Sequence, residues 1–464
     1  MFKKLRYTFL LFLLLQINVN AQDAYRMRKL ASYNNPSLPK VDGTDIWNDL
    51  TGYYDPIKNR EYIICGGTDS IYVFDITDAA NMKRIAAVSG ASIFAKNRDY
   101  ETFQHYAYCV SDQGSGIGAL QIFDLQYLPD SFPEVYHSNV LGTYTHTIFV
   151  DSVSERLYMS SNSKPGGFSA MDIISISDPI HPVFLAELTV PTKSGGFPLF
   201  NVVHEMFAKN DTVYLSCGEA GLYIFDLRNL ADQRLIGSIN SYPDQGYNHS
   251  SWLDKTGKKI MFTDENAGLD IKIFDISSMN NPKFISQFNS NTFTTSHNAY
   301  WYGNFAYVSA YHDGVVVYDI TDPSNPIKAA WYDTHPVSPE VYGGYKGCWG
   351  IYPYLPSKHI IASDLTAGIF VFEIDSALLG SEEIEKIHNE ITVFPNPSNG
   401  KIKISKEGIH FNQIKVFNTF GELQMQLFVN ENRVEIDLSY LAQGLYFIEC
   451  SSADGIYRKK ILKQ

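Results

Sequence analysis

The sequence predicts an all-β protein in which a seven-bladed β-propeller is followed by a small C-terminal β-sandwich. Three observations predict the propeller: a recurring strand motif, a four-strand unit around each copy, and an N-terminal segment that resembles the strand missing from the last unit. Apolar residues in these units alternate along short runs and do not recur at helical spacing, which favours strands.

The recurring motif is a β-rich run that ends in an acidic or small residue, as in IYVFDITD, LYIFDLRN and VVVYDITDP. The copies recur about every 50 residues, a period typical of propeller blades, each of which is a four-stranded sheet. The residue after the aromatic position marks the seven copies: Asp75, Asp124, Ser175, Asp226, Asp275, Asp319 and Glu373.

The sixth unit divides into four strand-like segments, SHNAYWYG, NFAYVSAYHDG, VVVYDITDPSNP and IKAAWYDTH. The sequences HDG, EAG, ENAG and TAG supply the turn before the third strand of a unit. Asp178 and Asp322 each precede a proline, where we expect Asx turns rather than calcium ligands.

The seventh unit ends near Asp375 without a fourth strand, although a closed ring must cover its last edge. Near the N-terminus, YRMRKLASYNN resembles the fourth strands MKRIAAVSG and QRLIGSINS. We therefore expect residues 25–35 to complete blade seven, which supports seven blades over six or eight.

The first 21 residues have the pattern of a secretory signal peptide, with Lys3, Lys4 and Arg6 ahead of a short apolar run and a small residue, Ala21, at the expected cleavage site. The apolar run is shorter than the roughly 20 residues that span a bilayer, and no later window is longer. We expect a propeller over residues 22–376 with no transmembrane segment after cleavage.

Removal of the signal peptide leaves 34 basic residues (37 less three) against 50 acidic ones, a net charge of −16. An acidic surface repels phosphate, so nucleic acid is excluded as the expected partner.

Five cysteines do not define a disulfide framework, because three of them, Cys65, Cys109 and Cys217, fall inside apolar strands of different units, where buried thiols are expected.

These repeats resemble LVIVD repeats, and the order of the motifs is similar to that of the choice-of-anchor B family of bacterial surface propellers. The matching pieces include THTIFVD, VVHEMFAKNDTVYLS and NHSSWLDKTGKKIMFTDENAG, and they cover roughly residues 40–376. The resemblance implies a propeller and a cell-surface or secreted location, and it implies no activity.

After a charged linker at residues 377–390, residues 391–464 resemble the type A C-terminal sorting domain of the type IX secretion system. Four ordered motifs carry the resemblance: VFPNPSNGKIKI, IKVFNTFGELQMQ, VEIDLSYLAQGLYFIE and the terminal YRKKILKQ, which we expect to form an exposed edge strand. The motif residues are Pro395, Asn396, Pro397, Gly400, Gly444, Tyr446, Lys459 and Lys460.

By this resemblance, the type IX machinery recognises the domain after Sec export to the periplasm. A surface sortase then removes the domain, and the body is anchored at the outer-membrane surface or released. The alternative is an accessory adhesion sandwich.

Four histidines stand at the starts of consecutive first strands, which line the channel of a propeller: His146, His204, His249 and His297. Asp99 stands at the matching place in blade two and Trp349 in blade seven. Neutral imidazoles with Asp99 or Glu205 could hold a transition metal at the channel mouth. The alternative is that each histidine bonds a carbonyl of the next blade or a water.

The sequence HEMFA at His204 lacks the second histidine of a zinc-protease helix, and no nucleophile elbow, Walker loop or dinucleotide fingerprint is present. Two classes of function remain. The first is a non-enzymatic propeller that binds a glycan or protein, for which the aromatic-rich segment 334–355 is the candidate binding loop. The second is a metal-dependent enzyme, hydrolytic or redox, at the histidine mouth.

Overall fold

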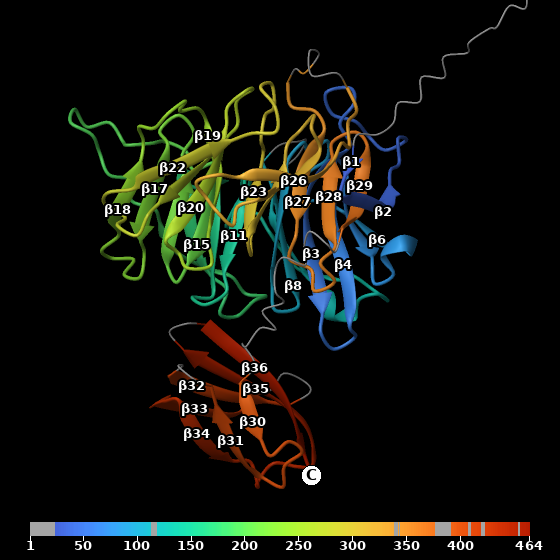
Figure 1. The fold of residues 1–464 in the computed structure, drawn as a ribbon, viewed down its shortest axis with the longest axis vertical. Helices are drawn as coiled ribbons and strands as arrows, with labels where there is room; N and C mark the ends of the chain where they lie inside the picture. Colours follow the sequence, from blue (N-terminus) through green and yellow to red (C-terminus); the bar gives the residue numbers. More distant parts are fainter. Residues whose placement is uncertain are drawn as a thin grey trace, which may run out of the picture. The chain divides into compact units, whose positions relative to one another are not determined.

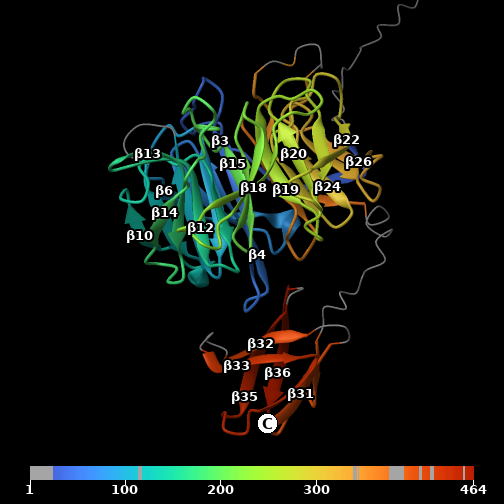
Figure 2. The same ribbon diagram turned by 90° about the vertical axis from the view of Figure 1, so that its left-hand side faces the viewer.

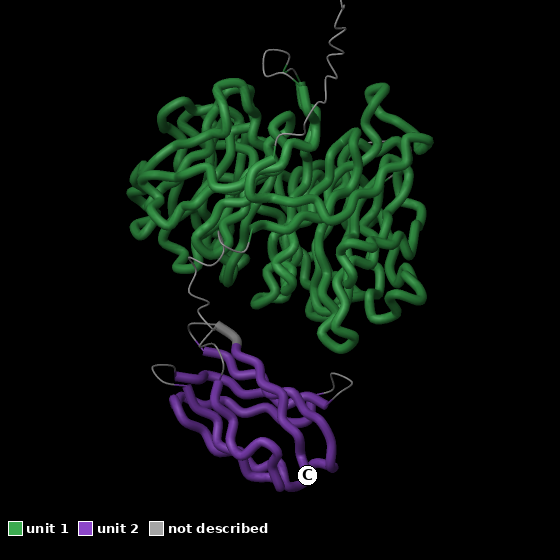
Figure 3. Tube along the Cα trace, turned by 45° about the vertical axis from the view of Figure 1, so that its right-hand side comes forward, with its two compact units in different colours: residues 1–378 green, residues 379–464 purple. Residues whose placement is uncertain are grey.

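The computed structural model describes residues 24–112, 118–337, 342, 344–375, 391–406, 410–418, 423–452 and 455–464. The signal peptide and the linker at residues 377–390 lie outside the described residues. The chain divides into two compact units, residues 1–378 and 379–464 (Figure 3).

Within its described residues, the first unit contains seven sheets of at least four strands each, arranged as the blades of a propeller (Figures 1 and 2). The first strand of each blade lies innermost: β3 (Trp47–Asp55), β7 (Arg98–Phe103), β11 (Ile148–Asp151), β15 (Glu205–Lys209), β19 (Asn248–Leu253), β23 (Ala299–Tyr302) and β27 (Cys348–Tyr352). The second strands are β4 (Arg60–Gly67), β8 (Tyr106–Ser111), β12 (Arg156–Lys164), β16 (Thr212–Ser216), β20 (Lys259–Asp264), β24 (Phe305–Ser309) and β28 (Ile360–Asp364).

The third strands are β5 (Ser70–Asp75), β9 (Leu120–Asp124), β13 (Gly167–Ser175), β17 (Leu222–Asp226), β21 (Ile271–Asp275), β25 (Val315–Asp319) and β29 (Gly368–Ile374). The outer strands are β6 (Lys83–Ser89), β10 (Glu134–Ser138), β14 (Val183–Glu187), β18 (Arg234–Ile239), β22 (Lys283–Phe288), β26 (Ile327–Tyr332) and, in the last blade, β2 (Met27–Tyr33). Short 3-10 turns, η1 (Ala79–Asn81) and η2 (Leu125–Tyr127), follow β5 and β9.

The core lies between neighbouring blades, because each sheet is apolar on both faces. Between blades three and four, for example, Tyr158 and Met171 pack with Met206 and Phe225, and all four side chains are buried. This two-sided burial explains why the second and third strands read as nearly continuous apolar runs.

The N-terminal segment joins the last two blades. β2 pairs antiparallel with β29, from Met27 opposite Ile374 to Tyr33 opposite Ile369. The preceding β1 (Ala24–Tyr25) pairs instead with β26 of blade six, and Arg26 turns the chain between the two with a φ of 53°. One N-terminal segment therefore holds two neighbouring blades.

The acidic residue of the repeat makes the turn after the third strand. The carboxylates of Asp75, Asp124, Asp226, Asp275 and Asp319 each accept a hydrogen bond from the main-chain N–H two residues later. Asp178 and Asp322 form the same Asx turn, with Ile180 and Ser324 as donors. The repeat is thus a strand-and-turn signal, as these side chains use their oxygen to cap the backbone.

The described residues of the second unit form two sheets. One contains β30 (Thr392–Phe394), β31 (Lys401–Ser405) and β34 (Arg433–Asp437), and the other β33 (Leu423–Glu431), β32 (Phe411–Phe417), β35 (Gly444–Ser452) and β36 (Gly455–Lys463) (Figure 2). Alternating apolar residues such as Ile402, Ile404, Ile414 and Val416 form its buried core.

All five cysteines are free and buried, as expected of small apolar side chains inside strands. Across the described residues, no helix has the length and apolarity needed to cross a bilayer.

Candidate functional site

The inner strands of all seven blades line one central channel, which contains two cavities. The first residues of these strands surround a cavity of about 260 Å³, here called the histidine mouth, and residues further along the same strands surround a second cavity of about 320 Å³. Asp49, Asp99, Thr147 and Glu205 line both cavities, so the two are successive sections of the channel.

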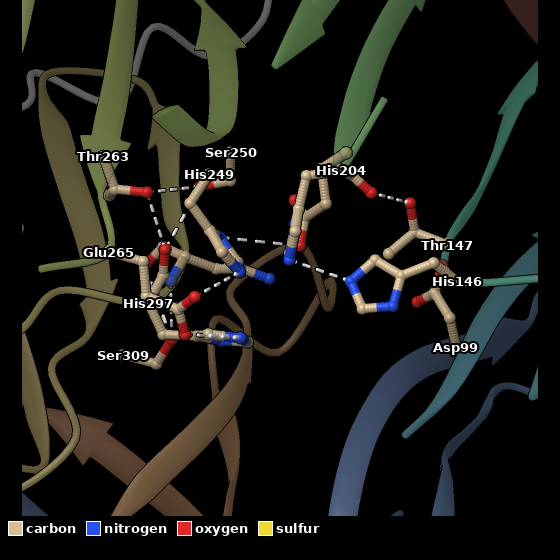
Figure 4. Close-up of polar contacts among 12 residues, drawn as sticks. Asp99, His146, Thr147, His204, His249, Ser250, Thr263, Glu265, His297 and Ser309 are labelled. Carbon is tan, nitrogen blue, oxygen red and sulfur yellow. Dashed lines mark hydrogen bonds and ion pairs between the residues drawn. The ribbon is translucent and has the colours of Figure 1, made fainter. Parts of the chain in front are cut away.

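Four histidines form a continuous arc around the mouth (Figure 4), and Trp349 extends this arc beyond His297. The ring centroids of successive residues in the order His146, His204, His249, His297 and Trp349 are 4.2, 4.1, 4.4 and 4.5 Å apart. The sequence predicts these histidines at the starts of consecutive inner strands, and the structure brings successive rings into contact.

A break in strand register helps to place these side chains. Pairing of β19 with β20 shifts between Asn248 and Ser251, and pairing of β27 with β28 shifts between Cys348 and Ile351. Such bulges change the direction of side chains next to a site. They allow two consecutive residues, His249 and Ser250, to face the channel.

The position of Asp99 differs from the expected one. Asp99 pairs with Val110 of β8 as Glu205 pairs with Ser216 of β16, so Asp99 is equivalent to Glu205 and lies one residue beyond the histidine position. Arg98 holds the histidine position in blade two, and its guanidinium donates to the carbonyl oxygens of neighbouring loops. The sequence repeat aligned Asp99 one residue away from its true equivalent, because the repeat does not fix the position of the first residue within the inner strand.

The carboxylate of Asp99 is already bonded to the main chain. Oδ1 accepts from the N–H of Tyr100 at 2.9 Å, and Oδ2 accepts from the N–H of Ile148 at 2.6 Å. The bond from Ile148 joins blades two and three, which is a structural role at this position.

A different carboxylate, Glu265, completes the mouth. Each of His204, His249 and Glu265 offers one ligand atom, and these three atoms lie within 4.8 Å of one another. The Nε2 atom of His249 is 3.6 Å from Oε2 of Glu265, and the Tyr311 hydroxyl donates to Oε1 of Glu265 at 2.5 Å. Glu265 begins no inner strand, since it belongs to the ENAG turn, and sequence reasoning assigned that segment only to turn formation.

The remaining histidines occupy the flanks. The Nε2 atoms of His146 and His204 are 2.9 Å apart, and Nδ1 of His146 is 2.5 Å from Oδ2 of Asp112. His297 has the alternative arrangement, a hydrogen bond to a main-chain carbonyl of the next blade, because its Nδ1 lies 2.7 Å from the carbonyl oxygen of Trp349. The Nδ1 atoms of His204 and His249 are buried and have no hydrogen-bond partner among the described residues.

Burial keeps the central histidines neutral. It lowers the pKa of His204 and of His249 well below the usual value, and the adjacent imidazoles add to the shift. The main chain at His249 opposes the shift of His204, and the main chain at His297 opposes the shift of His249, although neither contact has the geometry of a hydrogen bond. Burial also lowers the pKa of His297 to about 3 and raises that of Glu265 to about 7, against the bond from Tyr311.

The aromatic segment 334–355 contributes to both cavities. Tyr345 and Trp349 line the histidine mouth, and Tyr352 and Tyr354 line the second cavity. Residues 338–341 and 343 of this segment lie outside the described residues.

The sorting-domain motif residues cluster around the last strand. Asn396 donates to the Lys460 carbonyl at 2.8 Å and accepts from the Leu462 N–H at 2.9 Å, so the motif partly covers the edge of β36 that we expected to be exposed. Pro395 and Pro397 flank Asn396, and Gly400 packs against Ser439 at a φ of 143°, where a side chain would collide.

In the same unit, Gly444 begins β35 at a φ of 158°, a backbone conformation that other residues rarely adopt. The buried Tyr446 ring donates its hydroxyl to the Ala442 carbonyl at 3.0 Å. On β36, Lys459 is half-buried and Lys460 is exposed, opposite Ile448 and Phe447 of β35.

Comparisons with known proteins agree with this architecture. A family model described as the LVIVD repeat matches residues 298–334, and one described as the secretion system C-terminal sorting domain matches residues 392–464. No curated protein is significantly similar to the chain.

Among solved structures, the chain is similar to the RRP9 WD40 repeats, with 9% identity, coverage of 75% of this chain and 97% of that chain, and a TM-score of 0.51. It is also similar to the Cps50 (Swd1) β-propeller domain of Myceliophteria thermophila, with 12% identity, coverage of 70% and 96%, and a TM-score of 0.48. The fold and the two family matches together define an LVIVD-repeat β-propeller with a type IX C-terminal sorting domain. The sorting domain indicates export and a surface or secreted location.

Proposed function

We propose that this protein is an exported surface propeller that binds its ligand at the histidine mouth, with a transition-metal ion held by His204, His249 and Glu265. The observation that carries the proposal is the convergence of the three ligand atoms within 4.8 Å. Two imidazoles and one carboxylate are a common ligand set for zinc and for ferrous iron, and such sites keep positions open for water or substrate.

The surroundings of this group support a metal site. The lowered pKa values leave His204 and His249 neutral, which is the form that binds a metal. Tyr311 donates to Oε1 of Glu265 while Oε2 faces His249, so Tyr311 would orient this carboxylate as outer-shell partners of metal ligands do. The cavity of about 260 Å³ in front of the group leaves room for a small ligand.

We also propose a route by which the chain is exported. The signal peptide at residues 1–21 directs Sec export to the periplasm, and the sorting domain then engages the type IX machinery and a surface sortase. The propeller is afterwards anchored at the outer membrane or released, with a glycan or a protein as its larger partner.

A second candidate function is catalysis at the same ion, hydrolytic or redox. It is favoured by the count of three protein ligands, because catalytic zinc sites hold three protein ligands and one water whereas structural sites are closed by four. In this role Glu205, whose carboxylate is 3.9 Å from Nδ1 of His249, stands next to the ligand set without belonging to it.

Metal analysis of the full chain, purified without an affinity histidine tag, tests the proposal. We expect about one zinc or iron ion per chain, its loss in His249→Ala and in Glu265→Gln, and its retention in His181→Ala, which removes an exposed histidine outside the channel. A wild-type chain that carries no metal and takes up none from zinc, copper or iron salts would contradict the metal site and leave a metal-free binding propeller.

A further inference from the structure

The second cavity of the channel, here called the carboxylate chamber, differs in chemistry from the histidine mouth. Its volume is about 320 Å³, and residues from all seven inner strands line it. Four of them carry carboxylates, and no described lining residue is lysine, arginine or histidine: the carboxylates belong to Asp49, Asp99, Glu101 and Glu205.

The chamber concentrates carboxylates without a basic partner. Burial raises the pKa of Asp49 to about 7 and raises the pKa values of Asp99 and Glu101 well above the usual range. Repulsion from neighbouring carboxylates adds to the shifts of Asp99 and Glu101. Burial therefore favours the neutral form of these groups, and a cation inside the chamber would stabilise their ionised form.

Aromatic rings form another part of the wall. The ring centroid of Trp252 is 4.7 Å from that of Tyr300 and 5.7 Å from that of Tyr354, with Trp252 and Tyr354 stacked. Phe149 and Tyr352 continue the lining on either side. The faces of such rings attract organic cations through their quadrupoles.

Two buried polar groups in the chamber wall lack a partner. Oγ of Ser251 and Oδ1 of Asn298 have no hydrogen bond among the described residues, although the two residues are only 4% and 3% exposed. The side chain of Asn298 interacts with Glu205, which fixes its position in the wall. Unsatisfied buried acceptors of this kind indicate a missing donor, and an ammonium or hydroxyl group supplies one.

The arrangement does not match a metal ion. Among the described residues, the group with metal-ligand spacing is His204, His249 and Glu265 in the mouth, and no carboxylate of the chamber joins it. Hard cations need several oxygen ligands in close contact with the ion, whereas a larger organic cation is satisfied by charges spread around it.

We infer that the carboxylate chamber binds a small organic cation, with an ammonium group among the four carboxylates and its alkyl part against the aromatic wall formed by Phe149, Trp252, Tyr300, Tyr352 and Tyr354. This site goes beyond the proposed metal mouth and does not depend on it, because the chamber's aromatic residues and Glu101 do not line the mouth.

Calorimetric titration of the full chain tests the inference. The probes are choline and putrescine as cations, 3,3-dimethylbutan-1-ol as the neutral isostere of choline, glucose as a neutral sugar, and calcium chloride. We expect saturable binding of at least one organic cation, about tenfold or more tighter than the isostere.

Variants locate the binding. We expect Glu101→Gln to weaken cation binding about tenfold and Trp252→Leu to do the same, whereas Glu435→Gln, the same change at an exposed carboxylate of the other unit, leaves it unaltered. Glu101→Gln is nearly isosteric, so it decides the case if Trp252→Leu fails to fold.

Three results would overturn the inference: no saturable binding of either organic cation, equal binding of the neutral isostere, or binding of calcium or glucose alone. The metal content of the same samples separates the two proposals. A chain that takes up no metal but binds choline would refute the metal site in the histidine mouth and support the cation site in the carboxylate chamber.

Discussion

At the scale of single residues, one buried ion pair in blade five shows how much a charged side chain inside a blade depends on its partner. Lys272 and Asp264 lie on neighbouring strands of blade five, and their side chains are fully buried at an Nζ to Oδ2 distance of 2.8 Å. Asp264 also accepts from Tyr242 at 2.8 Å and from the Gly246 N–H at 3.1 Å. This network is satisfied as a whole, so removal of one member leaves a buried charge without its partner.

We expect Lys272→Met to destabilise the propeller by about 3 kcal/mol, because the Asp264 charge stays buried without a cation. The double variant Lys272→Met with Asp264→Asn should recover most of the lost stability, since the neutral amide of asparagine needs no cation beside it. Thermal unfolding followed by circular dichroism measures the effect.

Arg28→Met is the matched control for that experiment. It breaks the ion pair with Glu373, whose N to O distance is 2.6 Å, but both side chains are largely exposed. Exposed pairs contribute about 0 to 1 kcal/mol. Equal losses in Lys272→Met and Arg28→Met would contradict the argument from burial.

At the scale of elements, the ring depends on a strand that is distant in sequence from the sheet it completes. β2 supplies the outer strand of blade seven, and β1 extends blade six, so the N-terminus ties together the two blades at which the chain closes. Without them, the edges of β26 and β29 would be left unpaired.

We expect a chain that begins at Asn34 to unfold at a temperature at least about 5 °C lower than the intact mature chain, since a loss of several kcal/mol shifts the midpoint of a domain this large by a few degrees per kcal/mol. A synthetic peptide with the sequence of residues 24–35 should restore part of the loss, and a scrambled peptide should not. An unchanged midpoint would show that the ring does not rely on this closure.

At the scale of the whole molecule, the two units have separate tasks. The propeller contains both channel cavities, and the C-terminal unit matches a sorting domain over residues 392–464. In that unit Asn396 holds β36 through its two hydrogen bonds, which links the Pro-Asn-Pro motif to the terminal basic segment.

We expect deletion of residues 392–464 to keep the chain inside the cell with its propeller folded, and Asn396→Ala to reduce surface delivery, because β36 loses its cover. Fractionation and immunoblotting of cells, outer membranes and medium measure delivery. Lys403→Gln, at an exposed side chain of the same unit, is the control. Undiminished surface delivery of the deletion variant would refute the role of this domain.

The sequence by itself determined the blade count, the strand order and the sorting domain. Each blade repeats one local pattern, an apolar strand that ends in an Asx turn at residues such as Asp75 and Asp319, and local patterns are legible in a single chain. The same repetition is the reason that the sequence predicts four histidines at the channel mouth, because the inner strand of each blade lines the channel.

Only the tertiary structure decided which side chains meet across the channel. Glu265 comes from a turn and meets His204 and Tyr311 of other blades, and Glu101 comes from the interior of a strand and faces residues of the other blades across the chamber. The one-residue offset between Asp99 and Arg98 was likewise set by pairing with β8. Spacing along the chain does not encode such contacts, because ring closure and strand register fix them together.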